Sequence, residues 1–499
     1  MRNFSGTYWG SRLASASSAL SRMGPTSFSS LRQKRDFSRQ LISQFETSPD
    51  SLQLDTDSRV AVIGSGPAGS FFSYFLLDMT QRLGMDVHID IFDPRDFSAI
   101  GPAGCNMCGG IISESLVQML ATEGINLPSS VVQRGIESYM LHTDCGSVRI
   151  DTPLHEKRIA AIHRGTGPRD VDVKRNQWFS FDRHLQDLAV NKGAHLVRDR
   201  VDGLSWQAGR PQLKTRRGAL QAYDLLAVAV GVNSASLKVF QELVPGYKPP
   251  ETTKTFICEY KLEHETIEAY FGDSMHVFLL NLPRLEFAAI IPKGEYVTVC
   301  LLGENIDAPL IKAFLESPAV RKCFPPEVSP EIPPCHCSPS INTCAAVQPF
   351  GDRFVFIGDS GVTRLFKDGI GAAYRTSKAA AEAAVFRGVS SESFRRHYWP
   401  TCRQIDVDNK IGKAIFAWTR LVQKRPHDIR GILRMVSREQ RCKGGSPRMS
   451  MALWDLFTGS AAYREIIMRA IHPGFIGGLL WNVLAANLPP SRPNAHRRA

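Results

Sequence analysis

The segment Val60–Gly69, with the sequence VAVIGSGPAG, constrains the fold more than any other part of the chain. Arg59–Ile63 has the composition of a buried strand, and the apolar run Phe71–Leu77 has helical spacing. Between them lie three glycines in the spacing G-x-G-x-x-G: Gly64, Gly66 and Gly69. This spacing permits a tight turn, close approach of a pyrophosphate, and close packing of the helix on the strand. Phosphates would then meet the unpaired N–H groups at the start of the helix.

A second apolar strand, Val87–Phe92, follows and ends in Asp93. This is about the separation at which an acidic residue binds the ribose of a dinucleotide. The two segments together predict a dinucleotide-binding unit, with ligand contacts from Gly64, Gly66, Pro67, Ala68, Gly69 and Asp93.

The length, net charge and cysteine content of the chain indicate its number of domains, its partners and its compartment. A chain of 499 residues predicts two or three domains, and its net charge of +12 suggests an acidic partner, such as a lipid surface, a phosphorylated substrate or an acidic protein. No nucleic-acid-binding module is evident, so nucleic acid is not an expected partner. The 11 cysteines are scattered rather than densely spaced, which favours a reducing compartment.

Residues 1–57 differ from the rest because they are rich in serine and arginine and poor in acidic residues. They read either as a transit peptide to a mitochondrial or plastid matrix or as a disordered basic leader of a cytoplasmic protein. No run of about 18 apolar residues occurs, so no membrane-spanning helix is expected.

The remaining pattern predicts interleaved domains. Nucleotide-binding segments are expected at 58–130, 181–250 and 336–400, substrate-domain segments at 131–180 and 251–335, and helices at 401–499. Four successive strands within Thr253–Leu302 predict an antiparallel sheet, and Phe181–Lys192 and Ala372–Phe386 predict helices. A dinucleotide domain assembled from separated segments is more typical of flavoproteins than of nicotinamide dehydrogenases.

The segment Arg353–Gly371, RFVFIGDSGVTRLFKDGIG, resembles a motif of flavin enzymes of the p-hydroxybenzoate hydroxylase type. The resemblance implies an α/β fold with an FAD-binding Rossmann-like domain, an inserted antiparallel-sheet substrate domain and a C-terminal helical region. It also implies that Asp359 binds a ribityl hydroxyl of FAD. The implied cofactor contacts here are Gly358, Asp359, Lys367, Asp368, Gly369, Ile370 and Gly371.

Four further segments resemble the geranylgeranyl reductases of this superfamily, which saturate isoprenoid double bonds. They are Cys108-Gly109-Gly110, Phe181-Asp182-Arg183, Ile291-Pro292-Lys293-Gly294, and Leu456–Gly459 with Tyr463-Arg464. The resemblance places Gly109 and Gly110 beside the flavin. Two departures are that Phe287–Ile290 replaces aromatic residues, and that Val230 stands where hydroxylases have an aspartate used with pyridine nucleotides.

The candidate catalytic residues are Cys108, Cys105 and Lys293. Cys105 and Cys108 form a C-x-x-C pair, which is either a redox dithiol or one cysteine packed on flavin beside an incidental one. Lys293 is a candidate for the mouth of the substrate site. Cys335-His336-Cys337 is not a recognised zinc spacing, even with Cys344 or Cys323 added, so no metal is expected.

The resulting expectation is an FAD-dependent oxidoreductase that reduces carbon–carbon double bonds of an isoprenoid or other lipid by hydride transfer from flavin N5. The alternatives are a monooxygenase of a lipophilic or aromatic substrate and a flavin electron carrier with an acidic protein partner. NADPH or reduced ferredoxin are candidate electron donors. A basic amphipathic helix at 429–441 and the apolar segment Phe475–Leu488, followed by Arg492, Arg497 and Arg498, predict peripheral membrane association.

Overall fold

The computed structural model describes residues 52–99, 104–105, 109–152, 159–165, 180–328, 331–333, 335–442 and 446–488. Leu52–Ala499 forms one unit of the chain. Residues 1–51 of the basic leader, Cys108 and the three C-terminal arginines lie outside the described residues.

A six-stranded sheet carries the predicted dinucleotide-binding unit. Its strand order is β20-β21-β12-β1-β2-β8, and all neighbours are parallel except the edge strand β20. The strands are β1 (Arg59–Ile63), β2 (His88–Phe92), β8 (His195–Val197), β12 (Leu225–Val228), β20 (Phe350–Gly351) and β21 (Phe354–Phe356). The chain continues from β1 to β2 on one side and reaches β12 on the other, so the order reverses at β1. In open parallel sheets a ligand binds at such a switch point, outside the carboxyl ends of the strands.

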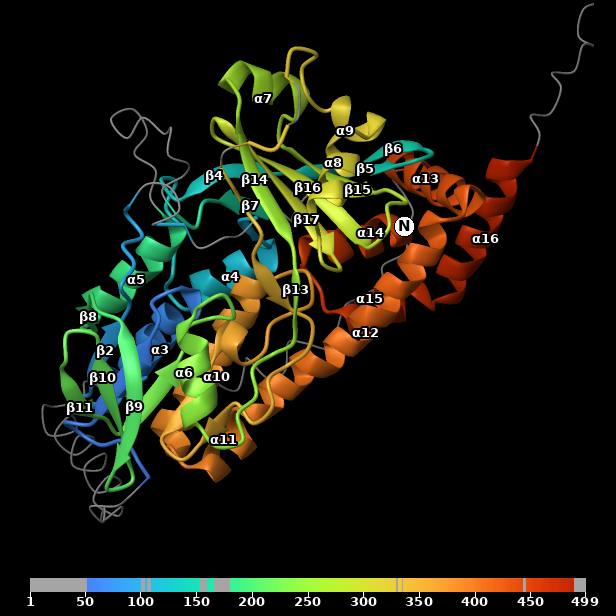
Figure 1. Cartoon of the computed structure of the whole chain (residues 1–499). Coiled ribbons are helices and arrows are strands. Elements are labelled where there is room, and N and C mark those ends of the chain that lie inside the picture. The colour runs from blue at the N-terminus through green and yellow to red at the C-terminus, as the bar shows by residue number, and fades with distance from the viewer. Residues whose placement is uncertain are drawn as a thin grey trace, which may run out of the picture. The chain divides into compact units, whose positions relative to one another are not determined.

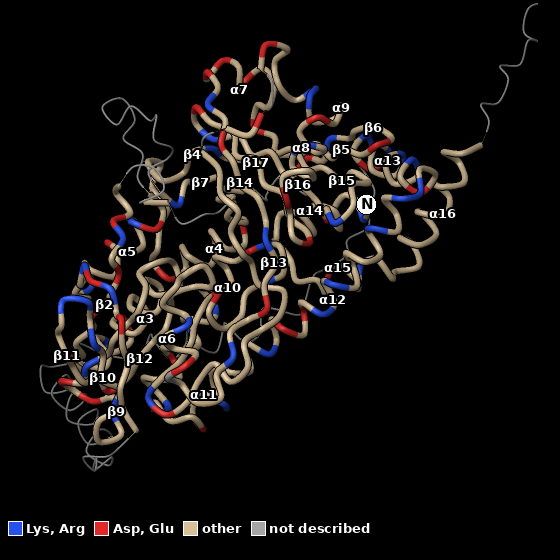
Figure 2. Tube along the Cα trace, in the orientation of Figure 1, with Lys and Arg blue, Asp and Glu red and all other residues tan. Residues whose placement is uncertain are grey.

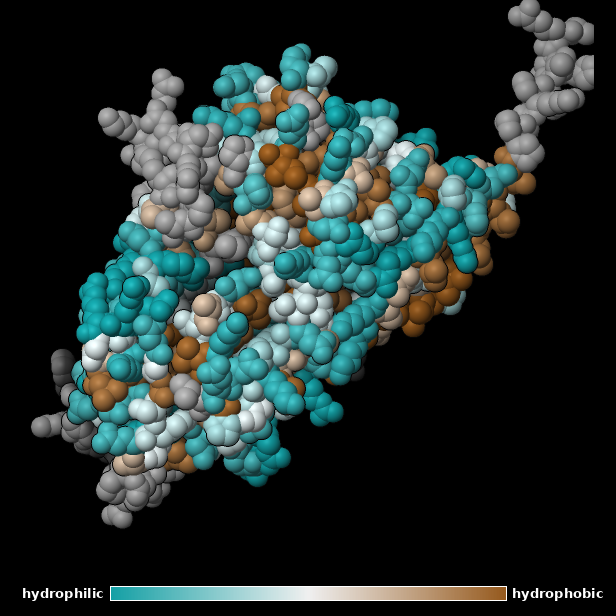
Figure 3. Space-filling model, viewed as in Figure 1, coloured by the Kyte–Doolittle hydropathy of each residue, from teal (hydrophilic) through white to brown (hydrophobic). Residues whose placement is uncertain are grey.

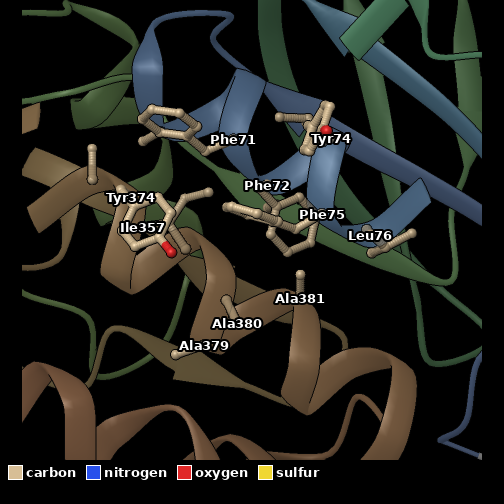
Figure 4. Packing of buried hydrophobic residues seen from close by; sticks show 14 of the residues in the cluster. Phe71, Phe72, Tyr74, Phe75, Leu76, Ile357, Tyr374, Ala379, Ala380 and Ala381 are labelled. Atoms are coloured by element: carbon tan, nitrogen blue, oxygen red, sulfur yellow. The ribbon is translucent and has the colours of Figure 1, made fainter. Parts of the chain in front are cut away.

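Helices α3 (Pro67–Leu83) and α10 (Gly369–Arg387) pack against each other beside this sheet (Figure 1). Figure 4 shows the contact: the rings of Phe71, Phe72 and Phe75 on α3 face Tyr374 and the alanines Ala379–Ala381 on α10. The Phe75 and Tyr374 rings meet edge to face, with centroids 5.5 Å apart. Small residues on α10 let the two helices approach closely, which places their N-termini at the same sheet edge.

The substrate sheet has seven strands in the order β18-β14-β17-β16-β15-β5-β6. They are β5 (Ser138–Thr143), β6 (Gly146–Asp151), β14 (Phe256–Lys261), β15 (Ser274–Leu279), β16 (Leu285–Lys293), β17 (Tyr296–Gly303) and β18 (His336–Cys337). The prediction of antiparallel strands within Thr253–Leu302 is confirmed for β14, β17, β16 and β15. The sheet is not wholly antiparallel, however, because β15 pairs with β5 in parallel.

Helices make up the C-terminal region, as predicted. They are α11 (Ser391–His397), α12 (Trp399–Gln423), α13 (Pro426–Arg441), α14 (Arg448–Thr458), α15 (Tyr463–Ala470) and α16 (Pro473–Asn487). Within the described residues, none of the helices combines the length and hydrophobicity needed to cross a membrane.

Two local features do not follow from the sequence pattern. Ile111–Ile112 forms strand β3 against β7 (Ile159–Ile162), and Ser113 then caps α4 (Glu114–Thr122) by accepting from Leu116 N. The pattern also missed a meander of three strands: β9 (Val201–Gln207), β10 (Arg210–Thr215) and β11 (Leu220–Ala222).

The other elements are shorter. The strands are β4 (Val132–Ile136), β13 (Thr252–Lys254) and β19 (Ser340–Asn342), and the helices are α6 (Ser236–Leu243), α7 (His264–Tyr270), α8 (Ala308–Leu315), α9 (Pro318–Arg321) and the 3₁₀ turn η3 (Gly358–Ser360).

Candidate functional site

The glycine turn after β1 requires glycine at two of its three positions for steric reasons. Gly64 has φ +99°, and a Cβ there would lie 2.6 Å from the carbonyl oxygen of Ala229, which directly follows the neighbouring strand β12. A Cβ on Gly69 would lie 1.9 Å from the carbonyl oxygen of Gly64. Gly66 differs, since its φ of −63° is open to any residue; it is the N-cap of α3 and supplies no side-chain cap. Helix α3 therefore begins with uncapped N–H groups at the switch point of the sheet.

Asp93, at the end of β2, is buried and organises this turn. Its carboxylate accepts hydrogen bonds from the N–H and the hydroxyl of Ser65, both at 2.9 Å, and from the N–H of Arg95 at 2.9 Å. The Ser65 hydroxyl in turn accepts from Gln186 of α5 (Phe181–Asn191) at 2.7 Å. Asp93 thus stabilises the glycine turn, a role that the sequence spacing did not indicate. A ribose hydroxyl would have to share this carboxylate with Ser65 and Arg95.

The second predicted motif lies directly against the first. Gly358 follows β21 with φ +61°, and a Cβ there would lie 2.6 Å from the Cβ of Ala68 in the glycine turn. The hydroxyl of Ser377 on α10 donates to the carbonyl of Ala68 at 2.7 Å. The predicted segments Val60–Gly69 and Arg353–Gly371 are therefore brought together at the carboxyl ends of β1, β12 and β21.

Asp359 sits in a polar environment that sequence reasoning only partly found. Burial raises the pKa of its carboxyl group, and the guanidinium of Arg164 opposes that shift. Arg164 is held by Asp182 through two hydrogen bonds of 2.8 Å, so the Phe181-Asp182-Arg183 motif positions a cation near Asp359. Asn342 donates to the Asp359 carbonyl at 2.8 Å, while its own side-chain oxygen is buried with no hydrogen-bond partner among the described residues.

The Lys367 side chain points away from this sheet edge. Its ammonium group donates to the carbonyls of Asp455 and Ala461, at 3.0 and 3.2 Å, and lies 4.0 Å from the centroid of the Tyr463 ring. Burial lowers the pKa of Lys367 well below its ordinary value. Of the predicted contacts in this loop, Lys367 can reach a ligand only through its backbone. The C-terminal motif around Leu456–Arg464 instead supports the loop from behind.

Asp368 starts α10 in the left-handed conformation, with φ 52°. Its carboxylate accepts from Arg364 at 2.8 Å and from Arg375 at 3.1 Å. A Cβ on Gly371 would lie 2.1 Å from that carboxylate, so glycine at 371 is what lets Asp368 fold back over the helix start. Gly369 and Ile370 then form the first turn of α10, as the motif predicted.

The Gly109–Gly110 loop packs on the substrate sheet. A Cβ on Gly109 would lie 2.9 Å from the sulfur of Cys300 on β17, and one on Gly110 would lie 3.0 Å from the Lys293 ammonium. Lys293 is 1% exposed, so the expectation that it stands at an open substrate mouth is wrong. Cys105 lies beside Gly165, whose Cβ would meet the Cys105 Cα at 2.9 Å. Cys108, the second cysteine of the C-x-x-C pair, lies outside the described residues.

A buried ionic cluster surrounds Lys293. Its ammonium is 3.7 Å from the Glu259 carboxylate, which also lies 3.3 Å from His163 and accepts from Thr298 at 3.0 Å. Burial alone would raise the pKa of Glu259, but His163, Lys293 and the hydrogen bonds outweigh it and lower that pKa to about 2. Glu259 is therefore ionised across the physiological range and fixes Lys293 beside the Gly110 loop.

Replacing Glu259 with glutamine is expected to lower the free energy of unfolding by about 3 kcal/mol at pH 7, since a buried lysine loses its counter-charge. A depressed carboxyl pKa stabilises the fold fully above the unfolded value of 4.5 and loses that contribution as pH falls towards 2. The difference between wild type and Glu259→Gln should therefore shrink to about half by pH 3. Urea unfolding at both pH values measures it, with the exposed Glu263→Gln as control. A pH-independent difference would contradict the assignment.

The Cys335-His336-Cys337 sequence does not assemble a metal site with Cys323 or Cys344. His336 lies in β18 and its Nδ1 is 2.8 Å from the carbonyl of Pro333, while the Cys344 sulfur accepts from Lys413 at 3.2 Å. Cys323 lies elsewhere, beside two histidines of the substrate sheet.

An apolar cavity of about 480 Å³ opens between the substrate sheet and the C-terminal helices. Leu141 of β5 and Leu279 of β15 form its floor, and helices α12 to α16 supply its walls. Almost every lining side chain is aliphatic or aromatic, so the cavity suits a hydrocarbon chain better than a polar ligand.

Four phenylalanine rings connect the α10 loop to this cavity. Phe366, in the loop, meets Phe416 at 5.2 Å between centroids; Phe416 stacks on Phe287 at 5.9 Å, and Phe287 meets Phe457 at 5.2 Å. The chain neighbours Ile415 and Leu456 line the cavity. The Phe287–Ile290 departure from the reductase pattern thus still supplies one aromatic ring at this junction.

Neither the protein-family models nor the curated proteins give a match to this sequence. Solved structures do match. The flavin-dependent brominase Bmp2 is 14% identical with a TM-score of 0.53, covering 83% of this chain and 98% of its own. A flavoprotein/dehydrogenase from Cytophaga hutchinsonii is 14% identical with a TM-score of 0.53, covering 87% and 99%. The halogenase PltM is 13% identical with a TM-score of 0.52, covering 86% and 91%.

The chain has the fold of these flavin enzymes. This confirms the predicted architecture of a Rossmann-like domain, an inserted sheet domain and C-terminal helices. At such low identities the likeness concerns the fold alone.

Proposed function

We propose that this protein is an FAD-dependent oxidoreductase. The observation that carries the proposal is the convergence of two motifs at one sheet edge, where Gly358 touches Ala68 at the switch point. The residues fit the cofactor: α3 and α10 both begin there without side-chain caps, and the buried side-chain oxygen of Asn342 lacks a partner among the described residues. Such a set of donors and acceptors suits the pyrophosphate and ribityl groups of FAD.

In this proposal each group has a defined task. The N–H groups at the start of α3 bind the pyrophosphate, and Asp359, with Arg164 behind it, accepts from a ribityl hydroxyl. The positive end of α10 stabilises negative charge on the reduced ring. When bound, FAD would supply a two-electron carrier able to exchange hydride with a substrate. The Gly109–Gly110 loop and β16–β17 exclude water from that side.

We further propose that the substrate is a lipid with a long apolar chain, and that the reaction is reduction of a carbon–carbon double bond. The cavity, which would hold the chain, and the resemblance to geranylgeranyl reductases support this choice. Cys108, Cys105 and Lys293 remain candidates for the proton-handling groups near the ring.

The test is the visible spectrum of the purified protein, followed by anaerobic reduction and exposure to air. Stoichiometric flavin with slow reoxidation in air, and consumption of a prenyl alcohol by the reduced protein, are the expected results. Absence of flavin after reconstitution with FAD would overturn the proposal. Reduced flavin that reacts with no prenyl alcohol but passes electrons to an acidic protein would favour the electron-carrier alternative.

A monooxygenase is the second candidate. The observation that favours it is the fold, because the chain shares this fold with a flavin-dependent brominase and a halogenase, and neither is named as a reductase. Val230, in the place of an aspartate that hydroxylases use with pyridine nucleotides, argues against it. Rapid reoxidation coupled to hydroxylated product would decide for this candidate.

A lipid substrate calls for access to a membrane, and we propose that α15 and α16 supply it. Eleven of the exposed large apolar side chains lie in the C-terminal helices or directly after them: Val407, Trp418, Leu421, Ile467, Met468, Ile471, Ile476, Leu480, Trp481, Leu484 and Leu488. Figure 3 shows hydrophobic surface over this part of the chain, and Figure 2 shows lysine and arginine positions along the neighbouring α12 and α13. Such a combination suits the surface of an anionic membrane.

The expected membrane contact of the helix at 429–441 needs correction in one respect. On α13, Ile429, Met435 and Val436 are buried, because the helix packs on β6 and α16. Its arginines include Arg430, which donates to Asn487 of α16 at 2.7 Å. Helix α13 can therefore offer charge to a membrane but not its apolar face.

Trp481 and Leu484 are 60% and 64% exposed, so the double variant Trp481→Asp/Leu484→Asp should fold normally. We expect it to bind phosphatidylserine-containing vesicles at least about tenfold more weakly in a sedimentation assay, because each side chain loses apolar burial in the bilayer. The matched control is Trp206→Asp/Leu220→Asp, which alters two exposed apolar residues on the β9–β11 meander. Equal losses in both double variants would contradict a specific membrane face.

A further inference from the structure

Two histidines and a cysteine meet on the substrate sheet at a place that none of the motifs described above uses. His142 of β5 and His276 of β15 lie side by side, because these strands pair in parallel and His142 is the register partner of Phe278. Leu141, next to His142, and Leu279, three residues after His276, line the apolar cavity. Since successive residues of a strand face opposite sides, both histidines face away from the cavity. Cys323, which follows α9, reaches them from the layer that covers this side.

The three ligand atoms form a small triangle. His142 Nε2 is 3.0 Å from His276 Nδ1, the latter is 3.2 Å from the Cys323 sulfur, and that sulfur is 3.8 Å from His142 Nε2. Tetrahedral binding with metal–nitrogen bonds of about 2.0 Å and metal–sulfur bonds of about 2.3 Å places ligand atoms about 3.3 to 3.6 Å apart. The observed edges bracket that spacing, so little movement would bring all three atoms onto one ion.

All three side chains are buried, and a hydrogen bond prepares His142 as a ligand. His142, His276 and Cys323 are 8%, 6% and 4% exposed. His142 Nδ1 lies 2.8 Å from the hydroxyl oxygen of Ser147, which can accept its proton and leave Nε2 with a lone pair facing the triangle.

We propose that His142, His276 and Cys323 bind a soft metal ion, Cu(I) or Zn(II). On binding, the sulfur–metal bond replaces the S–H bond, and the thiol proton passes to solvent. Phe278 stacks on His142 at 4.6 Å and Phe271 meets His276 at 5.1 Å, so the surroundings are apolar. Cu(I) with one thiolate and two neutral imidazoles is uncharged, whereas Zn(II) leaves one net positive charge. Because an uncompensated buried charge is costly, these apolar surroundings favour Cu(I).

A metal ion at this site would link the β5–β15 pair to the segment after α9. The site lies on the opposite face of the sheet from the cavity, and it includes none of the residues assigned to FAD. Its loss should therefore lower thermal stability while FAD content stays the same, and the two proposals can fail separately.

The test uses full-length protein titrated with Cu(I) against a Cu(I)-specific chelator and, separately, with Zn(II) against a chromophoric zinc chelator. We expect wild type to hold one equivalent more metal than Cys323→Ser or His276→Gln, with a raised unfolding temperature in wild type alone. Cys258→Ser, a buried cysteine of β14, and Cys335→Ser/Cys337→Ser are controls that should keep the extra equivalent. Retention of Zn(II) but not Cu(I) supports the site and assigns it to zinc.

Wild type that holds no more of either metal than Cys323→Ser would overturn the proposal and leave a hydrogen-bonded histidine pair. X-ray absorption on metal-loaded wild type covers the case in which the variants do not fold. Two nitrogen ligands and one sulfur ligand are expected, and a sulfur-only shell would contradict the site.

Discussion

Replacement of Gly66 by valine is expected to yield a folded protein that does not retain FAD. Gly66 has φ −63°, so a side chain does not strain its backbone. The side chain would instead stand at the N-terminus of α3, where the pyrophosphate is proposed to bind. We expect FAD affinity to fall more than about a hundredfold, or ~2.7 kcal/mol. Flavin absorbance after gel filtration measures retention, and thermal unfolding of the apoprotein measures folding.

The neighbouring glycines provide the contrast. A Cβ on Gly69 would meet the Gly64 carbonyl at 1.9 Å, so Gly69→Val should fail to fold even without cofactor. Gly135, which has open space around its Cβ position, supplies a neutral Gly135→Val control. If Gly66→Val stayed fully flavin-loaded, the assignment of this turn to the cofactor would be wrong, whereas an unfolded Gly66→Val would show that the glycine serves the fold.

The dinucleotide-binding unit could be predicted from sequence because its requirements are local. A strand, three glycines at fixed spacing and a helix lie within one short stretch, and the steric reasons for Gly64 and Gly69 involve atoms of that turn and the next strand. The Gly358–Gly371 loop could be predicted for the same reason, because its motif also lies within one short stretch. That the two motifs touch follows from the sheet order, which depends on pairing between strands far apart in the chain.

Side-chain direction could not be predicted in the same way. Lys367 belongs to the motif but points to Asp455 and Ala461, about ninety residues further along. The sequence pattern of α13 predicts an apolar face in contact with a membrane, yet α16 and β6 cover this face. The direction of Lys367 and the burial of the α13 face both depend on residues distant in the sequence, which local spacing does not reveal.

The triangle of His142, His276 and Cys323 is the extreme case of such long-range assembly. Its members are separated by 134 and 47 residues, so no motif could contain them. Single histidines in apolar strands are ordinarily read as core residues, and only the parallel pairing of β5 with β15 distinguishes these two.

Replacement of Ala452 by phenylalanine should separate chain binding from chemistry. Ala452 lies on α14, is 6% exposed and lines the apolar cavity of about 480 Å³. A phenyl ring there fills empty space, so the unfolding temperature should stay the same or rise. The ring would displace roughly four methylene groups of a bound chain, at about 0.8 kcal/mol each. We therefore expect kcat/KM for a prenyl alcohol of four isoprene units to fall about a hundredfold.

Chain length is what makes this result specific to the cavity. A prenyl alcohol of two isoprene units does not reach as far, so its kcat/KM should change less than about threefold in the same variant. FAD content should equal that of wild type, because Ala452 belongs to none of the cofactor-binding segments. Ala269→Phe, at an exposed position of α7, is the control for the added ring. Equal losses for long and short substrates would contradict binding of the chain in the cavity. The C-terminal helices would then serve membrane contact alone, since the helices that line the cavity also carry the exposed apolar residues.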